Sequence, residues 1–439
     1  MNAVRKFINE ARLYAVALGK WLAVAALTGV LCGLIGSAFA LSVGSVTRLR
    51  TANGWLIYLL PLAGVAVTAV YRAMHTEGMG TNDIIDAVHL GKPLNARLVP
   101  SIFIGTVLTH LCGGSAGREG AALQMGGTIG YWSSRLLRLD DRDTRTGTLC
   151  GMAAFFSALF GTPLTATMFA IMAISVGELY HAAFIPCFTA SLVAYGLSMW
   201  LGVAPVRFTA VIPALASSGL VRTAILAALC AWVSALFCAL LHSTARGMKK
   251  YIPNPWLRAA AGGAAVVALT LICGTTDYNG AGMDVITAAI EQGRVKPEAF
   301  ALKMLFTAVT LAAGFKGGEV VPCFFVGAAF GCAAAPLLGL PASFGAALGL
   351  VSVFCGATNC PIASTFLSIE LFGGSGLLYF ALACGVSYML SGYGGLYSSQ
   401  TILYSKLKAQ YINVHTNAHH AGDPDEKLPD VKGSVKDER

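Results

Sequence analysis

Long apolar runs separated by short polar segments make up most of this chain. The first run extends from Trp21 to Thr47, and several basic residues precede it within positions 1–20. At about 27 residues, the run exceeds the roughly 20 that a helix needs to span hydrocarbon. It is also too long for the apolar core of a signal peptide. We therefore expect residues 1–20 to form a cytoplasmic helix that leads into the membrane.

Further apolar runs follow along the chain, and their lengths are uneven. Several are shorter than a membrane span and several run together, which excludes a simple up-and-down bundle. The pattern predicts an all-α integral membrane protein with many uneven, partly broken transmembrane helices. The further runs lie at about residues 55–71, 99–111, 121–134, 147–176, 181–203, 222–242, 257–273, 300–313, 320–340, 343–369 and 376–392.

Composition narrows the class of protein. Charged residues are 12% of the chain, hydrophobic residues are 56%, and the mean hydropathy of +0.68 excludes a soluble enzyme. The net charge of +9 comes from clusters between apolar runs, so it indicates positive-inside anchoring and not a nucleic-acid surface. The twelve cysteines include no C-x-x-C pair, so we expect buried apolar thiols, no metal site and no cofactor.

Glycines gather where two apolar segments break, at 113–120 and at 314–318. Broken helices leave backbone amides unpaired, so these stretches must be buried in protein or line a wet cavity. The positions of Gly114, Gly117, Glu119 and Gly127 recur 200 residues later as Gly314, Gly317, Glu319 and Gly327. Matching breaks in two halves indicate a transporter's central site, so we expect repeats over 21–205 and 219–410.

Glu119 lies in the first break, directly before an apolar helical run. Helix N-terminal amides at membrane depth form an anion site without a fixed cation. Burial favours the protonated carboxyl and the amides favour the carboxylate, so Glu119 is suited to exchange a proton. A group that blocks an anion path and also binds protons can couple the two. Alternatively, Glu119 only caps its helix and pairs with Arg118.

Four motifs together resemble the CLC family of chloride channels and transporters. They are G-R-E-G at 117–120, G-M-G at 78–80, G-G-E-V-V-P at 317–322 and a late tyrosine, Tyr397. The resemblance covers residues 21 to about 409. It implies two inverted repeats, one anion path in each subunit of a homodimer, and a gating glutamate at the position of Glu119.

The departures from that family are informative. In the chloride-handling members of the family that this chain resembles, a serine helps to hold the central anion. Here that position is Met79, followed by Gly80, Thr81 and Asn82. Glu319 stands where an apolar residue is usual. These changes resemble the fluoride and proton exchanging branch, often called CLC-F. A protonated Glu319 can offer fluoride a strong O–H donor, whereas an ionised one repels it. The alternative for Glu319 is a helix-start acid favoured by the dipole.

Two features leave the transport mode open. The inner proton-relaying glutamate of chloride exchangers falls at Met172 or Ala173, which favours a channel unless Glu319 takes part of its role. Val321 replaces the threonine that the fluoride branch often carries. The resemblance places Glu119 and Glu319 as gating and proton-coupling residues. The implied anion-binding residues are Met79, Gly80, Asn82, Gly117, Arg118, Gly120, Val320, Val321 and Tyr397.

Some candidates have structural alternatives. Asn82 is equally well explained as the cap of a helix starting at Asp83, and Tyr397 as an interfacial tyrosine. Glu370 more plausibly bonds within its own helix, and His110 is a satisfied core histidine unless a second ligand accompanies it. The tail at 413–439 has the composition of disorder and contains no paired nucleotide-binding module.

The sequence thus predicts a multi-pass protein of the cell inner membrane with the bilayer, fluoride, protons and a second copy of itself as partners. Its expected function is fluoride export in exchange for protons, which gives fluoride resistance. The alternative is a chloride channel or chloride/proton exchanger of the same fold. An intramembrane enzyme is disfavoured because no nucleophile or metal cluster accompanies Glu119 or Glu319.

Overall fold

The computed structural model describes residues 2–417, which form sixteen α-helices, one small sheet and three short 3₁₀ helices at Gly54–Leu59, His181–Ala183 and Ala335–Leu338. Up to residue 200 the helices are α1 (Asn2–Ala52), α2 (Leu60–Ala73), α3 (Thr81–Leu90), α4 (Leu98–Leu111), α5 (Glu119–Leu136), α6 (Asp141–Phe160), α7 (Pro163–Met172) and α8 (Phe184–Trp200). From residue 217 onward they are α9 (Ser217–Tyr251), α10 (Pro255–Cys273), α11 (Met283–Glu291), α12 (Ala299–Ala312), α13 (Val320–Ala334), α14 (Ala342–Thr358), α15 (Pro361–Phe372) and α16 (Leu377–Leu390).

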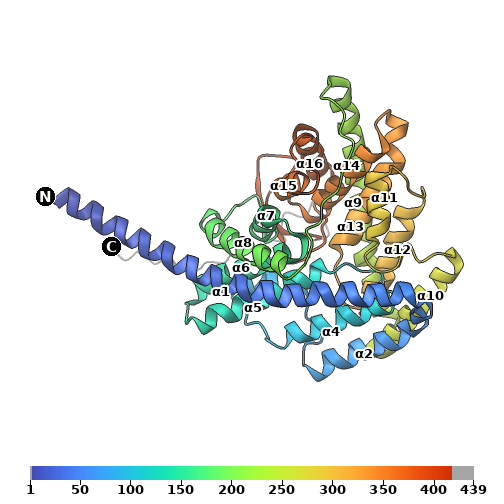
Figure 1. The fold of residues 1–439 in the computed structure, drawn as a ribbon, viewed down its shortest axis with the longest axis horizontal. Coiled ribbons are helices and arrows are strands. Elements are labelled where there is room, and N and C mark those ends of the chain that lie inside the picture. The colour runs from blue at the N-terminus through green and yellow to red at the C-terminus, as the bar shows by residue number, and fades with distance from the viewer. Residues whose placement is uncertain (1, 418–439) are drawn as a thin grey trace.

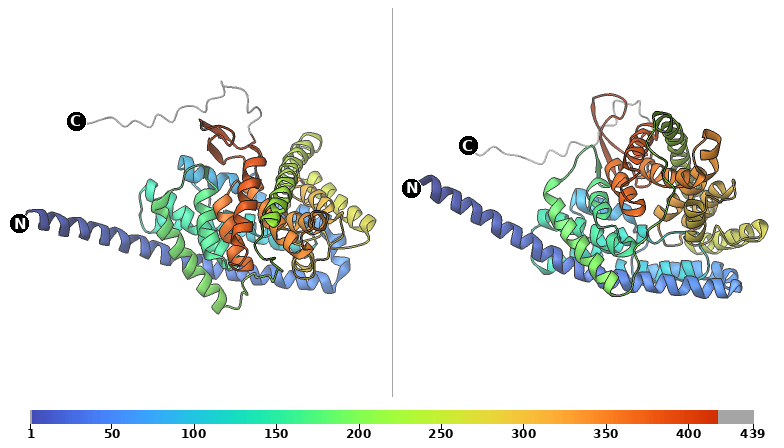
Figure 2. Two further views of the ribbon diagram at one scale, coloured as in Figure 1. Left: turned by 90° about the horizontal axis from the view of Figure 1, so that it is seen from above. Right: turned by 45° about the horizontal axis from the view of Figure 1, so that its top comes forward.

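Helix α1 runs along one edge of the helical body and projects beyond it at its N-terminal end (Figures 1 and 2). The helix expected at residues 1–20 is therefore the first part of a longer helix that continues without a break to Ala52. Residues 5–20 are exposed, and packing against the body begins near Trp21. The start of burial thus coincides with the start of the uncharged run.

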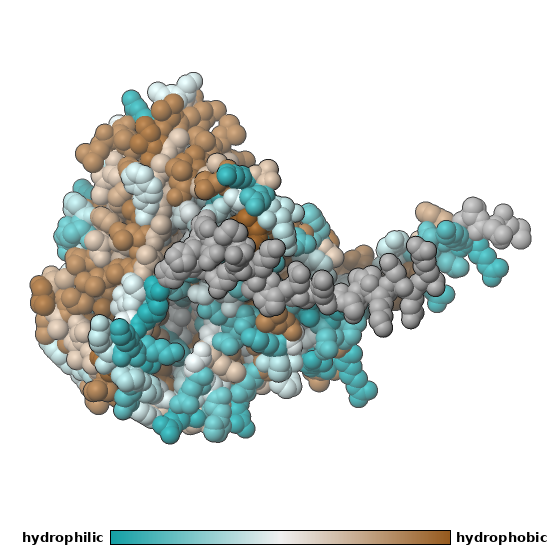
Figure 3. Space-filling view, turned by 180° about the vertical axis from the view of Figure 1, so that it is seen from behind, coloured by the Kyte–Doolittle hydropathy of each residue, from teal (hydrophilic) through white to brown (hydrophobic). Residues whose placement is uncertain are grey.

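Membrane-spanning character is uneven along the chain, as predicted. Within the described residues, six helical segments are long and apolar enough to cross a bilayer, and six other apolar helices are shorter. Large apolar side chains are exposed on the long helices, including Trp200 and Trp232. In Figure 3, apolar surface covers much of the visible face, while polar side chains gather at its lower edge and on the projecting end of α1. This is an integral membrane protein whose apolar outer surface suits lipid.

Two glycine-lined crossings hold the interior together. Where α5 meets α6, a Cβ on Gly151 would lie 2.8 Å from Gly130 Cα. Where α13 meets α14, a Cβ on Gly349 would lie 2.9 Å from Gly331 Cα. Small residues let helix backbones approach closely where apolar burial alone gives little driving force. The same device therefore anchors the helix that follows each of the two breaks.

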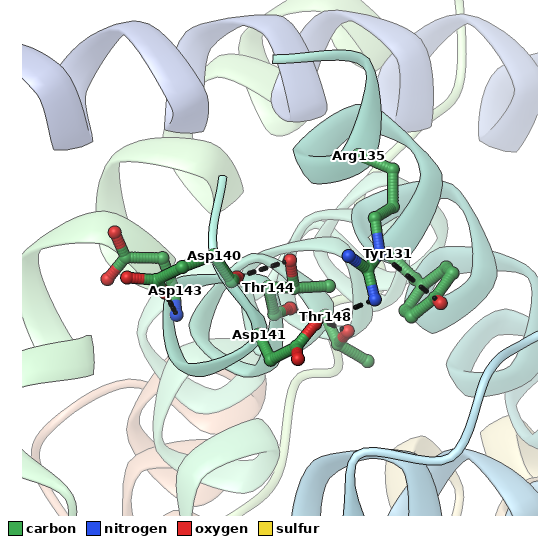
Figure 4. Close-up of polar contacts among 7 residues, drawn as sticks. All are labelled: Tyr131, Arg135, Asp140, Asp141, Asp143, Thr144 and Thr148. Atoms are coloured by element: carbon green, nitrogen blue, oxygen red, sulfur yellow. Dashed lines mark hydrogen bonds and ion pairs between the residues drawn. The ribbon is translucent and has the colours of Figure 1, made fainter. Parts of the chain in front are cut away.

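The turn between α5 and α6 is held by polar contacts at the end of these helices (Figure 4). Arg135 donates from Nη2 to Asp141 Oδ1 at 2.8 Å, and the Asp140 carboxylate accepts the Asp143 amide as an N-cap at 2.7 Å. Asp143 also pairs with Lys20 of α1. These contacts fasten the point where α1 enters the body to the end of the glycine-lined pair.

A small sheet adds to the helical fold. The strands are β1 (Ser175–Val176), β2 (Thr401–Tyr404) and β3 (Tyr411–His415), with β2 between the other two. Strand β3 and the hydrogen bond from Thr416 to the Gln400 carbonyl show that residues 413–417 are ordered. The predicted start of the disordered tail at residue 413 was therefore wrong by several residues. Pairing with β2 provides hydrogen-bond partners for the backbone of this polar segment. The rest of the predicted tail, 418–439, lies outside the described residues.

Candidate functional site

The two glycine-rich breaks meet in the middle of the protein. Gly117 donates its N–H to the Gly318 carbonyl at 2.7 Å, and Gly318 donates back to the Gly117 carbonyl at 2.8 Å. The predicted helical runs follow directly, since α5 begins at Glu119 and α13 at Val320. This antiparallel bridge places the N-termini of α5 and α13 beside each other.

The bridge decides which backbone amides are free for a ligand. Within residues 2–417, the first-turn amides of Gly120, Ala121, Val320 and Val321 donate to no acceptor, as expected for the first amides of a helix. The Gly117 amide is engaged in the bridge. The two adjacent helix ends therefore supply four amides for an anion, and three of them belong to predicted residues.

Glu119 occupies the first break. Its side chain is 1% exposed, and its Oε2 accepts the Arg118 backbone N–H at 2.8 Å. The Arg118 Nε lies 3.5 Å from Glu119 Oε1, and the Arg118 guanidinium also donates to the Leu159 carbonyl at 3.3 Å. The contact with Arg118 that the alternative interpretation required is thus present. In this conformation the carboxylate, not a diffusing anion, occupies the break.

Glu319 approaches the same point from the second break. It is the N-cap residue of α13 and is half-buried, and within the described chain its carboxyl makes no cap bond to the first turn of the helix. A Cβ on Gly120 would lie 3.2 Å from Glu319 Oε2 and 2.8 Å from Gly318 Cα. Glycine at position 120 therefore leaves room for the second carboxyl against the start of α5. The two carboxyl groups are also electrostatic neighbours.

The segment before α3 contributes less than predicted. Met79 is half-buried against the core, but the Gly80 amide donates to Asp83 Oδ2 at 2.8 Å and is not available to an anion. Helix α3 begins at Thr81, so the prediction that Asn82 caps a helix starting at Asp83 was wrong. Asn82 is exposed, and its Oδ1 accepts the Ser399 amide at 3.1 Å. It therefore fastens α3 to the loop that carries Tyr397.

Tyr397 is buried near the two breaks. Its side chain is 1% exposed, and its hydroxyl has no hydrogen-bond partner within the described chain. It lies within electrostatic range of Glu319. A buried hydroxyl without a partner is costly, so this group is suited to donate to a bound anion. Burial also removes the alternative of an exposed interfacial tyrosine.

The remaining anion-path candidates, Val320 and Val321, are buried at the start of α13. A Cβ on Gly117 would lie 3.0 Å from Val321 Cβ, so the valine packs directly over the bridge. Met172 ends α7 and Ala173 is buried behind it. No ionisable side chain therefore stands at the position implied for an inner proton relay.

Two structural expectations need correction. Glu370 does not bond within its own helix: its carboxylate accepts the amides of Leu164 at 3.1 Å and Thr165 at 2.8 Å, and the Thr165 hydroxyl at 2.5 Å. It therefore caps α7 from α15. His110 is only half satisfied, because its Nδ1 contacts the Thr106 carbonyl at 2.9 Å while its Nε2 has no partner within the described chain.

Sequence reasoning missed two polar residues around the site and the bridging role of Gly318. Asp83 takes the Gly80 amide, Gln124 donates to the Thr81 hydroxyl at 3.1 Å, and Gly318 completes the bridge. Asp83 follows Gly80 by three residues, which is the spacing of a capping box, so this contact could have been predicted from the sequence. Gln124 and Gly318 carried no comparable signal, because their partners lie far away in sequence.

The geometry supports proton-linked anion binding. Four free amides and one unpartnered hydroxyl provide donors, while two carboxyl groups compete with an anion for the same space. Protonation of a carboxyl removes its negative charge and converts it from an acceptor into a donor. The described residues contain no group of three or more His, Cys, Asp or Glu side chains suited to a metal.

Comparisons with known proteins agree with this geometry. Residues 63–392 match the family described as voltage gated chloride channel. The chain is 36% identical to the chloride/fluoride channel protein of Pseudomonas syringae pv. tomato over 428 residues, which covers 94% of this chain and 91% of that protein. It is 35% identical over 168 residues to the H(+)/Cl(-) exchange transporter ClcA of Vibrio vulnificus, covering 34% of this chain and 36% of that protein.

Solved structures show the same fold. The chain resembles the crystal structure of a CLC-type fluoride/proton antiporter with a TM-score of 0.84 and 32% identity, covering 88% of this chain and 98% of that one. It resembles a slow cyanobacterial Cl⁻/H⁺ antiporter with a TM-score of 0.73 and 18% identity, covering 84% and 94%. The chain therefore belongs to the CLC family of voltage-gated chloride channels, whose members are channels and transporters and not enzymes.

Proposed function

We propose that this protein exchanges fluoride for protons and exports fluoride from the cytoplasm. The observation that carries this proposal is the second carboxyl group, because Glu319 reaches the start of α5 beside the buried gate Glu119. Fluoride is small and strongly hydrated, so its dehydration requires strong donors, and a protonated carboxyl is one. The likeness to a CLC-type fluoride/proton antiporter at 32% identity supports the same choice.

Each carboxyl has a distinct role in this proposal. Glu119 is the gate: in the structure its carboxylate fills the break and is held by Arg118. Protonation weakens its contacts with the Arg118 amide and guanidinium, so the side chain can leave the break and the free amides can bind fluoride. Glu319 is the second proton-binding group and offers its O–H to the anion. The amides of Gly120, Val320 and Val321 and the hydroxyl of Tyr397 complete the anion site, with Met79 at its inner entrance.

The proposal includes an arrangement in the membrane. The halves 21–205 and 219–410 are inverted repeats, and each subunit of a homodimer carries one anion path. Matching glycine crossings at α5–α6 and α13–α14 support the repeats. The basic N-terminal helix faces the cytoplasm, and the protein lies in the inner membrane of the cell.

The test uses the purified protein in sealed liposomes. A fluoride gradient should drive protons uphill, and an equal chloride gradient should drive them weakly. Glu119→Gln should abolish proton coupling, because the amide neither ionises nor releases a proton. Glu77→Gln is the control, since Glu77 is exposed in a loop. Stoichiometric proton movement that persists in Glu119→Gln contradicts the proposal.

A passive chloride channel is the second candidate. It is favoured by the name of the Pseudomonas relative and by Met172 and Ala173, which leave the inner relay position without an acid. It predicts anion flux without proton movement and a preference for chloride over fluoride. The same liposome experiment separates the two functions in one measurement.

A further inference from the structure

A cluster of cationic side chains lies outside the carboxyl site, around two glycine turns. Lys303 of α12 is 0% exposed and donates from Nζ to the carbonyls of Tyr278 at 3.1 Å and Gly280 at 2.7 Å. The Gly280 amide donates to the Gly114 carbonyl at 3.1 Å. Lys303 is thus linked through one turn to the break that leads to Glu119.

Arg50, near the end of α1, reaches the same two turns. A Cβ on Gly280 would lie 3.1 Å from Arg50 Nη2, and a Cβ on Gly113 would lie 3.4 Å from Arg50 Nη1. Within residues 2–417 its guanidinium makes no hydrogen bond or ion pair, and its Nε is buried without a partner. A guanidinium carries five donors, so this is an unusual deficit for a half-buried arginine.

His110 adds a second unpartnered group. Its side chain is 2% exposed, its Nε2 has no partner within the described chain, and its electrostatic neighbours are Arg50, Arg118 and Lys303. All three neighbours are cationic. Asp284 is an electrostatic neighbour of Arg50, but it is exposed, and within the described residues the two form no ion pair at 4 Å or less. Lys303 is held by two carbonyls and lies over the Phe325 ring, whereas no ion pair within the described residues balances the Arg50 guanidinium.

A buried guanidinium without a counterion is unfavourable, because arginine does not lose its proton in proteins. An anion that binds between Arg50 and Lys303 would supply the missing charge and accept the unused donors. Glycines at 113 and 280 let the Arg50 guanidinium lie directly against the two turns. The uncharged run 21–47 separates Lys20 from Arg50 by more than a bilayer thickness of about 30 Å. If residues 1–20 face the cytoplasm, Arg50 therefore lies at the opposite face of the membrane. Figure 1 shows the end of α1 that carries Arg50 at the opposite end of the helix from the N-terminus.

We propose that Arg50 and Lys303 form an outer anion-binding site for small inorganic anions, separate from the carboxyl site at Glu119. The site holds an anion at the outer end of the path, next to the break loop. Its role in transport rests on the proposed function, but the binding of an anion there does not. His110 flanks the site without contacting either cation in the structure.

The first test is anion binding, which does not depend on coupling or on fluoride preference. Crystals of the full-length protein grown in bromide should show an anomalous peak beside the Arg50 guanidinium. The peak should vanish in Arg50→Gln and remain in Arg48→Gln. The Arg48 variant is a matched control because Arg48 is exposed on the same helix end and donates to the Ser45 hydroxyl one turn earlier. Absence of the peak in the unaltered protein would overturn the proposal.

The second test is flux in liposomes at limiting and saturating anion. Arg50→Gln should raise the apparent KM for the anion about tenfold, equivalent to 1.4 kcal/mol, and leave the maximal rate within about twofold. Arg48→Gln should change neither. An unchanged KM in Arg50→Gln contradicts a role in transport. If the protein proves to be a chloride channel, the proposal of fluoride/proton exchange is wrong. The bromide peak still tests the proposed anion site at Arg50.

Discussion

The capping of α7 by Glu370 leads to a quantitative prediction. Helix α7 begins with Pro163, so its first amides in need of an acceptor belong to Leu164 and Thr165. Thr162 is in the N-cap position but makes no side-chain cap bond. The Glu370 carboxylate accepts both amides and the Thr165 hydroxyl, at 2.5–3.1 Å. One side chain of α15 thus replaces the local cap.

The magnitude follows from these three bonds. Substitution of a normal N-cap costs about 1 kcal/mol and up to about 2, and each bond to an ionised group contributes about 1.5–3 kcal/mol. Glu370→Ala leaves two helix amides without an acceptor, so we expect a loss of about 2–4 kcal/mol. Glu370→Gln keeps one acceptor oxygen and can donate to the Thr165 hydroxyl, so we expect a loss of about 1 kcal/mol.

The assay is thermal unfolding of the detergent-purified protein, measured by size-exclusion chromatography of samples heated to a series of temperatures. The midpoint should fall in the order wild type, Glu370→Gln, Glu370→Ala, with several degrees between the extremes. Glu77→Ala, an exposed loop substitution, is the control and should change little. A midpoint for Glu370→Ala within one degree of wild type would refute the reasoning.

Two further predictions concern a close approach and a titrating group. Gly120→Ala would bring a Cβ to 2.8 Å from Gly318 Cα and 3.2 Å from Glu319 Oε2. The substitution should reduce the free energy of unfolding by about 1–3 kcal/mol and abolish anion flux. Gly196 has open space around it, so Gly196→Ala should do neither. Burial lowers the pKa of His89, at the end of α3, from 6.5. The folded state then binds fewer protons than the unfolded chain, so stability falls as the pH drops below 6.5. His89→Gln should reduce the drop in the thermal midpoint between about pH 7.5 and pH 5.5, and an equal drop in both proteins would count against this effect.

The positions of the helix breaks could be predicted from the sequence because their causes are local. Glycine clusters interrupt apolar runs, and α5 and α13 start where the runs resume. The predicted burial of the cysteines is confirmed for eleven of the twelve, and Cys273 is half-buried. Hydrophobic length and composition also determined the class of protein, since an apolar outer surface of this extent requires a membrane.

The partners of the polar groups could not be predicted in the same way. Asp83 takes the Gly80 amide by a local rule, but Asn82 contacts Ser399 and Glu370 caps α7 across more than 200 residues of sequence. Residues 413–417 have a polar composition, yet pairing with β2 orders them. Neither the local composition nor the residue spacing shows which distant group a polar side chain will contact.

The sequence by itself therefore determined which segments are helical, where they break and which carboxyl groups lie in the breaks. Only the tertiary structure decided which donors remain free within residues 2–417: the Gly117–Gly318 bridge engages one amide and leaves those of Gly120, Val320 and Val321 available, and the packing of α1 leaves the Arg50 Nε without a partner. The physical reason is that helix formation depends on nearby residues, whereas hydrogen-bond and charge balance in a buried site depend on groups that meet only when the chain is packed.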